Sequence, residues 1–320
     1  MIMGKFNRGD SDTLFIIGIA ALLLVFLIGG RNFLNIGGTG FLSIPGGPSV
    51  FESVSRSDQS IQDPNSSYWR GKVSLSPGNV YEIQPYLEYV TINAGDVGES
   101  GVNISGWYLT NNKGQRRVQF GGNDQYFASD KAVIPYVAKL FLTNNSNYLS
   151  PVVLHSGGSA ILITGSFGNR SPFQVTSFQV NKCSGYLENV TGYDFHPPLS
   201  QSCPVPSKEV GADALQSDCY DFVKRMPYCH KPEMDKFVKV NGVEESGYVD
   251  GVGGLSNQCK TYLQAHYSYE GCLAYHATEE DFYKNEWRIF LNNSWELWGK
   301  DREVITLYDS SGKVVDQVSY

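Results

Sequence analysis

Positive charge is scarce in this chain. The 320 residues contain 25 Lys and Arg against 32 Asp and Glu, which gives a formal net charge of −7. Proteins that bind nucleic acid need clustered Lys and Arg side chains to contact phosphates. Arg116 and Arg117 form the only basic pair in an expected strand, and we interpret this pair as the solvated edge of a hairpin. The sequence therefore predicts no nucleic-acid partner.

Catalytic motifs are also missing. The sequence has no G-x-S-x-G, no P-loop, no G-x-G-x-x-G before an expected helix and no H-E-x-x-H. We therefore predict no catalytic, cofactor-binding or metal-binding residue and no cofactor. Paired carboxylates for glycoside hydrolysis stay open, because their geometry is not readable from a sequence. Acidic residues in the expected loops lack the D-x-D-x-D-G spacing of a calcium loop, namely Asp96, Glu99, Asp124 and Asp130.

Long apolar runs are missing except for one near the N-terminus. Leu14 to Ile28 are all apolar or Gly, and Gly29 and Gly30 extend the run to the lower limit of a spanning helix, about 17 residues. Lys5 and Arg8 precede it, which favours an inner N-terminus. We therefore predict a cytoplasmic segment at 1–12 and an uncleaved signal anchor at 13–30. This anchor would make the bilayer of the plasma membrane a partner and place the C-terminal domain, in a single-pass protein, outside the cell.

The rest of the chain changes character twice. Residues 31–70 are rich in Gly, Ser, Asn and Pro, which predicts a flexible stalk. Residues 71–166 then alternate in the manner of strands, with Pro77-Gly78 as a turn between expected strands at 73–75 and 80–83. Two further strands are expected within 152–164 around Gly157-Gly158, and a closing hairpin is expected at 304–318.

Cysteine is absent outside one segment of about 90 residues. The six cysteines are Cys183, Cys203, Cys219, Cys229, Cys259 and Cys272. An even number in a segment expected outside the cell favours disulfides, and six cysteines allow 15 pairings. Proximity in the sequence favours Cys183–Cys203, Cys219–Cys229 and Cys259–Cys272. Zinc is the alternative, with nearby ligands at Cys229, His230, His266, Cys272 and His276.

Helical patterns occur within the same segment. They cover 218–225, 256–265 and 279–288, the last with Thr278 as its N-cap. Aromatic residues at Tyr262, Tyr267, Tyr269 and Tyr275 either form a contact surface or cover a small core. The segment is thus expected to be mixed and partly helical.

Several motifs in order resemble a lamin-tail domain, a small immunoglobulin-like β-sandwich. They are Tyr89 to Asn93, Gly106-Trp107-Tyr108-Leu109, the strand pair at 152–163 and Leu307 to Asp316. The resemblance implies a mainly β fold in which 71–166 and 288–320 form one sandwich, with Trp107, Leu109, Leu307 and Val315 in its core.

The cysteine-rich insertion at 167–287 interrupts this sandwich. It resembles insertions in membrane-anchored lamin-tail proteins of small-genome, episymbiont-type bacteria. The quoted matches are 178–187, 195–204, 281–288 and 296–298.

Anchor, stalk, sandwich and insertion together lead to one functional expectation. The chain would be a non-catalytic cell-surface protein that displays its insertion for adhesion to a protein or glycan partner, with homo-oligomers possible in principle. The alternatives are an extracytoplasmic hydrolase that uses metal or carboxylates and a structural subunit of an envelope assembly.

Overall fold

The computed structural model describes residues 64–320, except for gaps at 112, 115, 121–122, 128–129, 145, 168–174, 235–237, 241–242, 246–248 and 300–301. Residues 61–320 form one compact unit. The predicted cytoplasmic segment, the predicted membrane anchor at 13–30 and the predicted stalk up to residue 63 lie outside the described residues. Among the described residues, no helix is long and apolar enough to cross a membrane.

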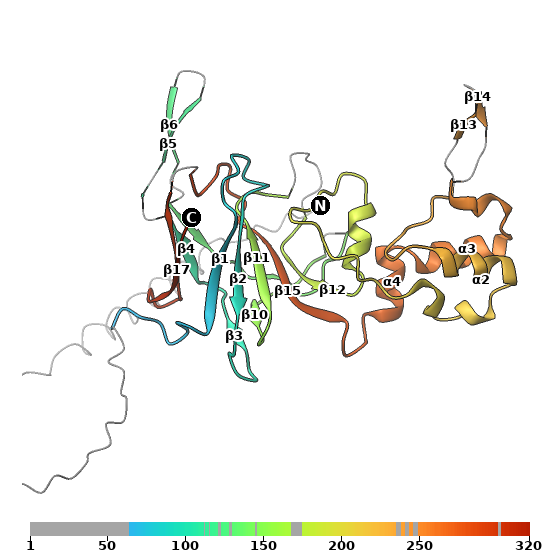
Figure 1. Ribbon diagram of the computed structural model, residues 1–320, viewed down its shortest axis with the longest axis horizontal. Helices are drawn as coiled ribbons and strands as arrows, with labels where there is room; N and C mark the ends of the chain where they lie inside the picture. Colours follow the sequence, from blue (N-terminus) through green and yellow to red (C-terminus); the bar gives the residue numbers. More distant parts are fainter. Residues whose placement is uncertain are drawn as a thin grey trace, which may run out of the picture. The chain divides into compact units, whose positions relative to one another are not determined.

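Seven strands form the larger sheet, in the order β1, β2, β11, β15, β12, β8 and β9 (Figure 1). Neighbouring strands are antiparallel, except that β11 runs parallel to β15 and β12 runs parallel to β8. The bounds are β1 (Val73–Asn79), β2 (Tyr89–Ala94), β11 (Ser159–Ile163), β15 (Tyr283–Phe290), β12 (Phe178–Asn181), β8 (Val137–Ala138) and β9 (Leu149–Ser150).

Four strands form a second sheet, in the order β17, β16, β4 and β7. Their bounds are β17 (Val314–Ser319), β16 (Val304–Tyr308), β4 (Tyr108–Thr110) and β7 (Lys131–Val133). The predicted closing hairpin is confirmed as β16 and β17, and Asp309 Oδ1 accepts hydrogen bonds from the backbone N–H groups of Ser311 and Lys313 in its turn. Two small pairs complete this part, β3 (Val102–Asn103) with β10 (Val153–Leu154) and β5 (Arg116–Phe120) with β6 (Asn123–Phe127).

The two sheets share one hydrophobic core. Alternate residues of β1, β2 and β11 meet apolar residues of β4, β16 and β17 in a single buried cluster. Burial of this kind is the main favourable term in folding. The motif residues Trp107, Leu109, Leu307 and Val315 all belong to the cluster and are at most 2% exposed.

Pro77 and Gly78 do not separate two strands as the sequence predicted. Both lie within β1, where the pairing with β2 is shifted between Ser76 and Asn79, and residues 80–83 form no strand. A bulge admits a proline and a glycine at positive φ, which a regular ladder does not. Gly78 has φ +56°, and a Cβ there would lie 2.5 Å from the carbonyl oxygen of Tyr89.

The start of the described chain is already packed against the sheet. Ser67 donates its backbone N–H to the carbonyl of Val314 on β17 at 2.8 Å, and Trp69 packs against the shared core. On β17, Asp316 Oδ2 accepts a hydrogen bond from the backbone N–H of Leu75 on β1 at 2.7 Å. The last residues of the predicted stalk, 66–70, are thus part of the folded unit.

The cysteine-bearing segment, residues 182–282, lies between β12 and β15. It contains α2 (Ser217–Arg225), α3 (Asn257–His266), α4 (Tyr269–His276), four short 3₁₀ helices and the hairpin of β13 (Val238–Val240) and β14 (Val243–Glu245). Its helices α2, α3 and α4 lie beyond β12, on the side away from β1 (Figure 1). A second buried cluster joins it to the sheet through Phe178, Val180 and Phe290.

The helices predicted at 218–225 and 256–265 are confirmed as α2 and α3, whereas the helix predicted at 279–288 is wrong. Residues 283–290 form β15, which is buried between β11 and β12. Phe282, Tyr283 and Trp287 fit a helical face, but the pairing with strands far away in the sequence overrides this local pattern.

Candidate functional site

All six cysteines form disulfides, but the pairing predicted from sequence proximity is wrong. The bonds are Cys183–Cys272, Cys203–Cys229 and Cys219–Cys259. Cys183 follows β12 and Cys272 lies on α4, so the first bond fastens a helix of the segment to the end of a sheet strand. The third bond joins α2 to α3. Tertiary packing determines which cysteines pair, and the number of residues between two cysteines does not reveal that packing.

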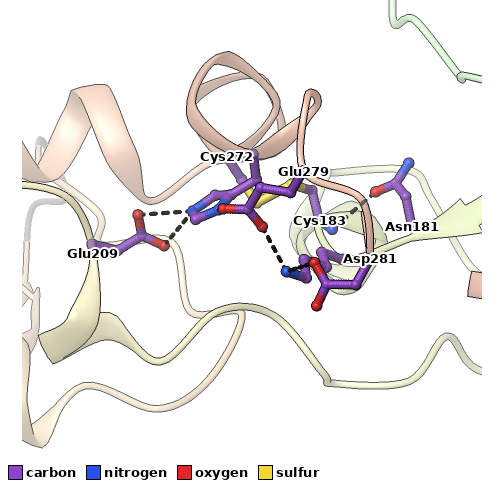
Figure 2. Close-up of polar contacts among 8 residues, drawn as sticks. Asn181, Cys183, Glu209, Cys272, Glu279 and Asp281 are labelled. Carbon is purple, nitrogen blue, oxygen red and sulfur yellow. Dashed lines mark hydrogen bonds and ion pairs between the residues drawn. A yellow bond between two sulfur atoms is a disulfide. The ribbon is translucent and has the colours of Figure 1, made fainter. Parts of the chain in front are cut away.

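A buried chain of charged groups lies beside the Cys183–Cys272 bond (Figure 2). His276, the last residue of α4, places Nε2 3.0 and 3.1 Å from the two carboxylate oxygens of Glu209. Its Nδ1 lies 2.8 Å from Oε1 of Glu279. The Glu209 side chain is 2% exposed and the His276 side chain 11%. One imidazole therefore bridges two carboxylates.

The chain of charges continues to the surface. Lys182 Nζ donates to Oε2 of Glu279 at 2.6 Å and also to Asp281. The exposed fraction of the side chain rises from 38% at Glu279 to 75% at Asp281. These hydrogen bonds, from Lys182 first and His276 second, hold the pKa of Glu279 below its ordinary value. From the interior to the surface, the groups are a carboxylate, an imidazole, a carboxylate, an ammonium group and a carboxylate. Their charges therefore alternate in sign.

The protonation state of His276 follows from this geometry. Both ring nitrogens face carboxylate oxygens that only accept hydrogen bonds, so both must carry a proton for both contacts to be hydrogen bonds. Burial opposes the charged ring, but hydrogen bonds to Glu279 and Glu209 outweigh burial and raise the pKa of His276 above its ordinary value. We conclude that the ring is an imidazolium that ties α4 to the loop carrying Glu209.

His266, the last residue of α3, flanks the same carboxylate without bonding to it. Its Nδ1 lies 3.8 Å from Oε2 of Glu209 and has no hydrogen-bond partner. The ring is stacked between Tyr262 and Tyr275, with centroids 4.1 and 4.0 Å away. Burial lowers the pKa of His266 although the charge of Glu209 raises it. The ring is thus stacked between two tyrosines, with the Glu209 carboxylate near the outer limit of an ion-pair distance.

Three of the five residues considered for zinc are engaged in other contacts. Cys229 and Cys272 are oxidised in disulfides and offer no thiolate. His276 uses both nitrogens on carboxylates. Across the described part of the chain, no group of three or more His, Cys, Asp or Glu side chains is placed to hold a metal ion.

The four tyrosines of the segment that were considered as a contact surface or core cover divide between these two interpretations. Tyr267 and Tyr269 are 1% and 2% exposed, and their hydroxyl groups donate to the carbonyls of Pro206 and Phe141 at 2.8 and 2.9 Å. They cover the core. Tyr275 is 41% exposed and Tyr262 is partly buried, so the side chains of these two alone offer surface.

A separate pocket opens on one face of the larger sheet, over β12 and β15. Its volume is about 530 Å³, within the range of about 300 to 1,000 Å³ typical of small-molecule sites. Its lining comprises Lys139, Ser150, Pro151, Val153, His155, Gln179, Tyr283, Lys284, Asn285 and Trp287. Two lysines and a histidine thus line the pocket, and the described lining contains no acidic residue.

Hydrogen bonds to the backbone fix the floor of this pocket. Trp287 Nε1 donates to the carbonyl of Val153 at 3.1 Å, and Gln179 Nε2 donates to the carbonyl of Lys284 at 2.9 Å. Asn285 Nδ2 donates to the carbonyl of His155 at 3.0 Å. These side chains are held in place before any ligand arrives, which lowers the entropy cost of binding.

The sequence offered little warning of this site. His155, Gln179, Lys139 and Lys284 carry no motif in the sequence. The one usable signal is the alternation of Tyr283, Asn285 and Trp287, which places three side chains on one face of a strand. The helical interpretation of 279–288 concealed it. The chain matches no protein-family model, no curated protein and no solved structure.

Proposed function

We propose that this chain is a non-catalytic, membrane-anchored protein of the cell surface. Its two-sheet domain is proposed to be an immunoglobulin-like sandwich of the lamin-tail type, held outside the cell by residues 13–30. Its disulfide-bonded insertion is proposed to serve adhesion to a protein or glycan partner. The observation that carries the proposal is the complete pairing of six buried cysteines, since structural disulfides persist in oxidising compartments outside the cytosol.

Two features of the described chain support binding rather than catalysis. The charged chain around His276 satisfies its own groups, and its most buried members, Glu209 and His276, face each other. The pocket over β12 and β15 has a fixed, polar floor, which suits recognition. Recognition residues set on a sheet are more rigid than residues set on loops.

Surface display is tested with the full-length chain in proteoliposomes of defined lipid. Vesicles that carry the protein should bind whole cells or envelope fractions, either of the organism that makes the protein or of neighbouring cells. Empty vesicles should not bind. Binding should disappear after reduction of the disulfides, because the insertion then loses its cross-links. Equal retention of loaded and empty vesicles on every fraction would overturn the proposal.

A structural role in an envelope assembly is the alternative for the same architecture. Both ends of the larger sheet are edge strands, β1 and β9, and Tyr148 and Leu149 at β9 are 88% and 63% exposed. Unpaired sheet edges can recruit another chain. Cross-linking of the protein in its native membrane separates the two functions, since an assembly subunit gives discrete oligomers in the absence of any added partner.

A further inference from the structure

We propose that the pocket over β12 and β15 binds an acidic oligosaccharide, with Lys139 and Lys284 as its carboxylate-binding groups. The inference rests on the proposed function and names the ligand class for it. It begins with charge. The chain as a whole carries −7, yet the described lining of this pocket holds two lysines and a histidine and no acid. A local reversal of sign of this kind selects an anionic ligand.

Neither lysine is neutralised by the protein. Within the described part of the chain, neither ammonium group has a carboxylate within 4.0 Å. Lys139 Nζ lies 4.9 Å from the centre of the Tyr283 ring, a cation–π distance. The hydrogen bond from Lys182 and, to a smaller extent, the charge of Lys284 lower the pKa of Asp281. The Asp281 carboxylate is thus already bonded to Lys182. Both ammonium groups can therefore donate charge-assisted hydrogen bonds to a ligand.

The remaining lining suits a sugar. Tyr283, which is partly exposed, presents aromatic surface on which the C–H face of a sugar ring can pack, whereas Trp287 is 3% exposed and belongs to the buried floor. Gln179 uses Nε2 on the backbone and keeps Oε1 as an acceptor for a hydroxyl group. Tyr148 and Tyr136 are 88% and 56% exposed beside β9 and β8, next to the strand ends that supply Ser150 and Lys139. Aromatic and amide groups around a fixed floor favour a ring-shaped, hydroxylated ligand.

A peptide is less well suited to this place. Peptides that bind sheets commonly add a strand at an exposed edge, where backbone N–H and C=O groups are free. β12 and β15 are interior strands, each hydrogen-bonded on both sides. The pocket lies on the face of the sheet, where only side chains are offered. The recognition must therefore come from charges, amides and aromatic rings.

The test measures binding of uncharged and charged tetrasaccharides to the full-length protein in detergent. The probes are a tetramer of galacturonic acid, the same tetramer with its carboxyl groups reduced, and a tetranucleotide of thymidine as a phosphodiester polyanion that is not an oligosaccharide. We expect the uronate tetramer to bind, its affinity to fall as ionic strength rises, and both other probes to bind at least tenfold more weakly.

Variants locate the site. Lys139→Ala and Lys284→Ala should each weaken uronate binding by about tenfold or more, the loss expected for one charge-assisted hydrogen bond. Lys224→Ala, an exposed lysine on α2, is the matched control and should change nothing. Circular dichroism checks that each variant is folded.

Three outcomes would overturn the inference, namely equal binding of charged and reduced tetramers, uronate binding that survives both lysine changes, and absence of all uronate binding. Vesicles that still adhere to cells under those outcomes would leave surface display standing with a different ligand. Vesicles that adhere to nothing would remove both proposals.

Discussion

Removal of the Cys183–Cys272 disulfide should loosen the cysteine-bearing segment more than removal of Cys203–Cys229. The first bond closes a loop of 89 residues and the second a loop of 26. On the chain-entropy model these loops correspond to about 4.6 and about 3.5 kcal/mol of stabilisation, respectively. The other two disulfides lie within the longer loop and shorten it when intact, so about 4.6 kcal/mol is an upper value.

The assay is hydrogen exchange of the full-length protein, followed by mass spectrometry of its peptides. In the Cys183→Ala/Cys272→Ala variant, amides of α4 and of the 3₁₀ helix Ser184–Asn189 should lose protection by about 10³-fold, since each 1.4 kcal/mol is about a factor of ten. The Cys203→Ala/Cys229→Ala variant should lose a few hundredfold at most. Amides of β2 and β11, which belong to the other core, serve as the internal control. Losses below tenfold, or the reverse order of the two variants, would refute the loop-entropy reasoning.

Three further predictions concern single side chains. The pKa of His276 is raised, so the stability that its charge contributes is fully present below about pH 6.5 and is lost as pH rises through the pKa of the folded state. Hydrogen exchange of α4 should show this loss in the wild type and not in His276→Gln. Identical pH profiles for the two proteins would contradict the prediction. Burial raises the pKa of Glu88 to about 8, although the N–H groups of Leu297 and Trp298 donate hydrogen bonds to its carboxyl group. The free energy of unfolding should therefore fall by roughly 3 to 5 kcal/mol between pH 4.5 and pH 8. Urea unfolding followed by tryptophan fluorescence should show a weaker dependence of this free energy on pH in Glu88→Gln, and an unchanged pH dependence would assign the effect to another group. Asp316→Ala should lower the free energy of unfolding by about 1.5 to 3 kcal/mol in the same assay, because the backbone N–H of Leu75 loses a charged acceptor. The control Asp309→Ala, in the adjacent turn, should leave that N–H hydrogen-bonded. A decrease below about 0.5 kcal/mol for Asp316→Ala would show that water replaces the carboxylate.

Local features of the fold were visible in the sequence. The turn at 309–312 is read from Asp309 and Gly312, which act through their own neighbours, and Gly312 takes φ +82°. The helices α2 and α3 follow from apolar periodicity around Cys219 and Cys259. Each of these features depends on residues only a few positions apart.

The remaining features depend on contacts between distant residues. β15 becomes a strand because Ser159–Ile163 and Phe178–Asn181 supply hydrogen bonds to it from more than 100 residues away. Glu209, His276 and Lys182 come from three separate segments and meet only in the folded chain. Of the pocket lysines, Lys139 follows β8 and Lys284 lies on β15, two strands that the sheet likewise brings into one structure. None of these juxtapositions has a local signature that a single sequence displays.

Display of a disulfide-bonded domain outside the cell is tested most directly on intact cells of the organism that makes the protein. A membrane-impermeant amine reagent and an impermeant maleimide are applied together, and the full-length protein is then isolated, denatured without reductant and mapped by mass spectrometry. The account predicts labelled lysines in residues 64–320, no alkylated cysteine and the three linked peptides 183–272, 203–229 and 219–259. Lysines that react only after lysis, together with cysteines that react with maleimide once the protein is denatured, would contradict it.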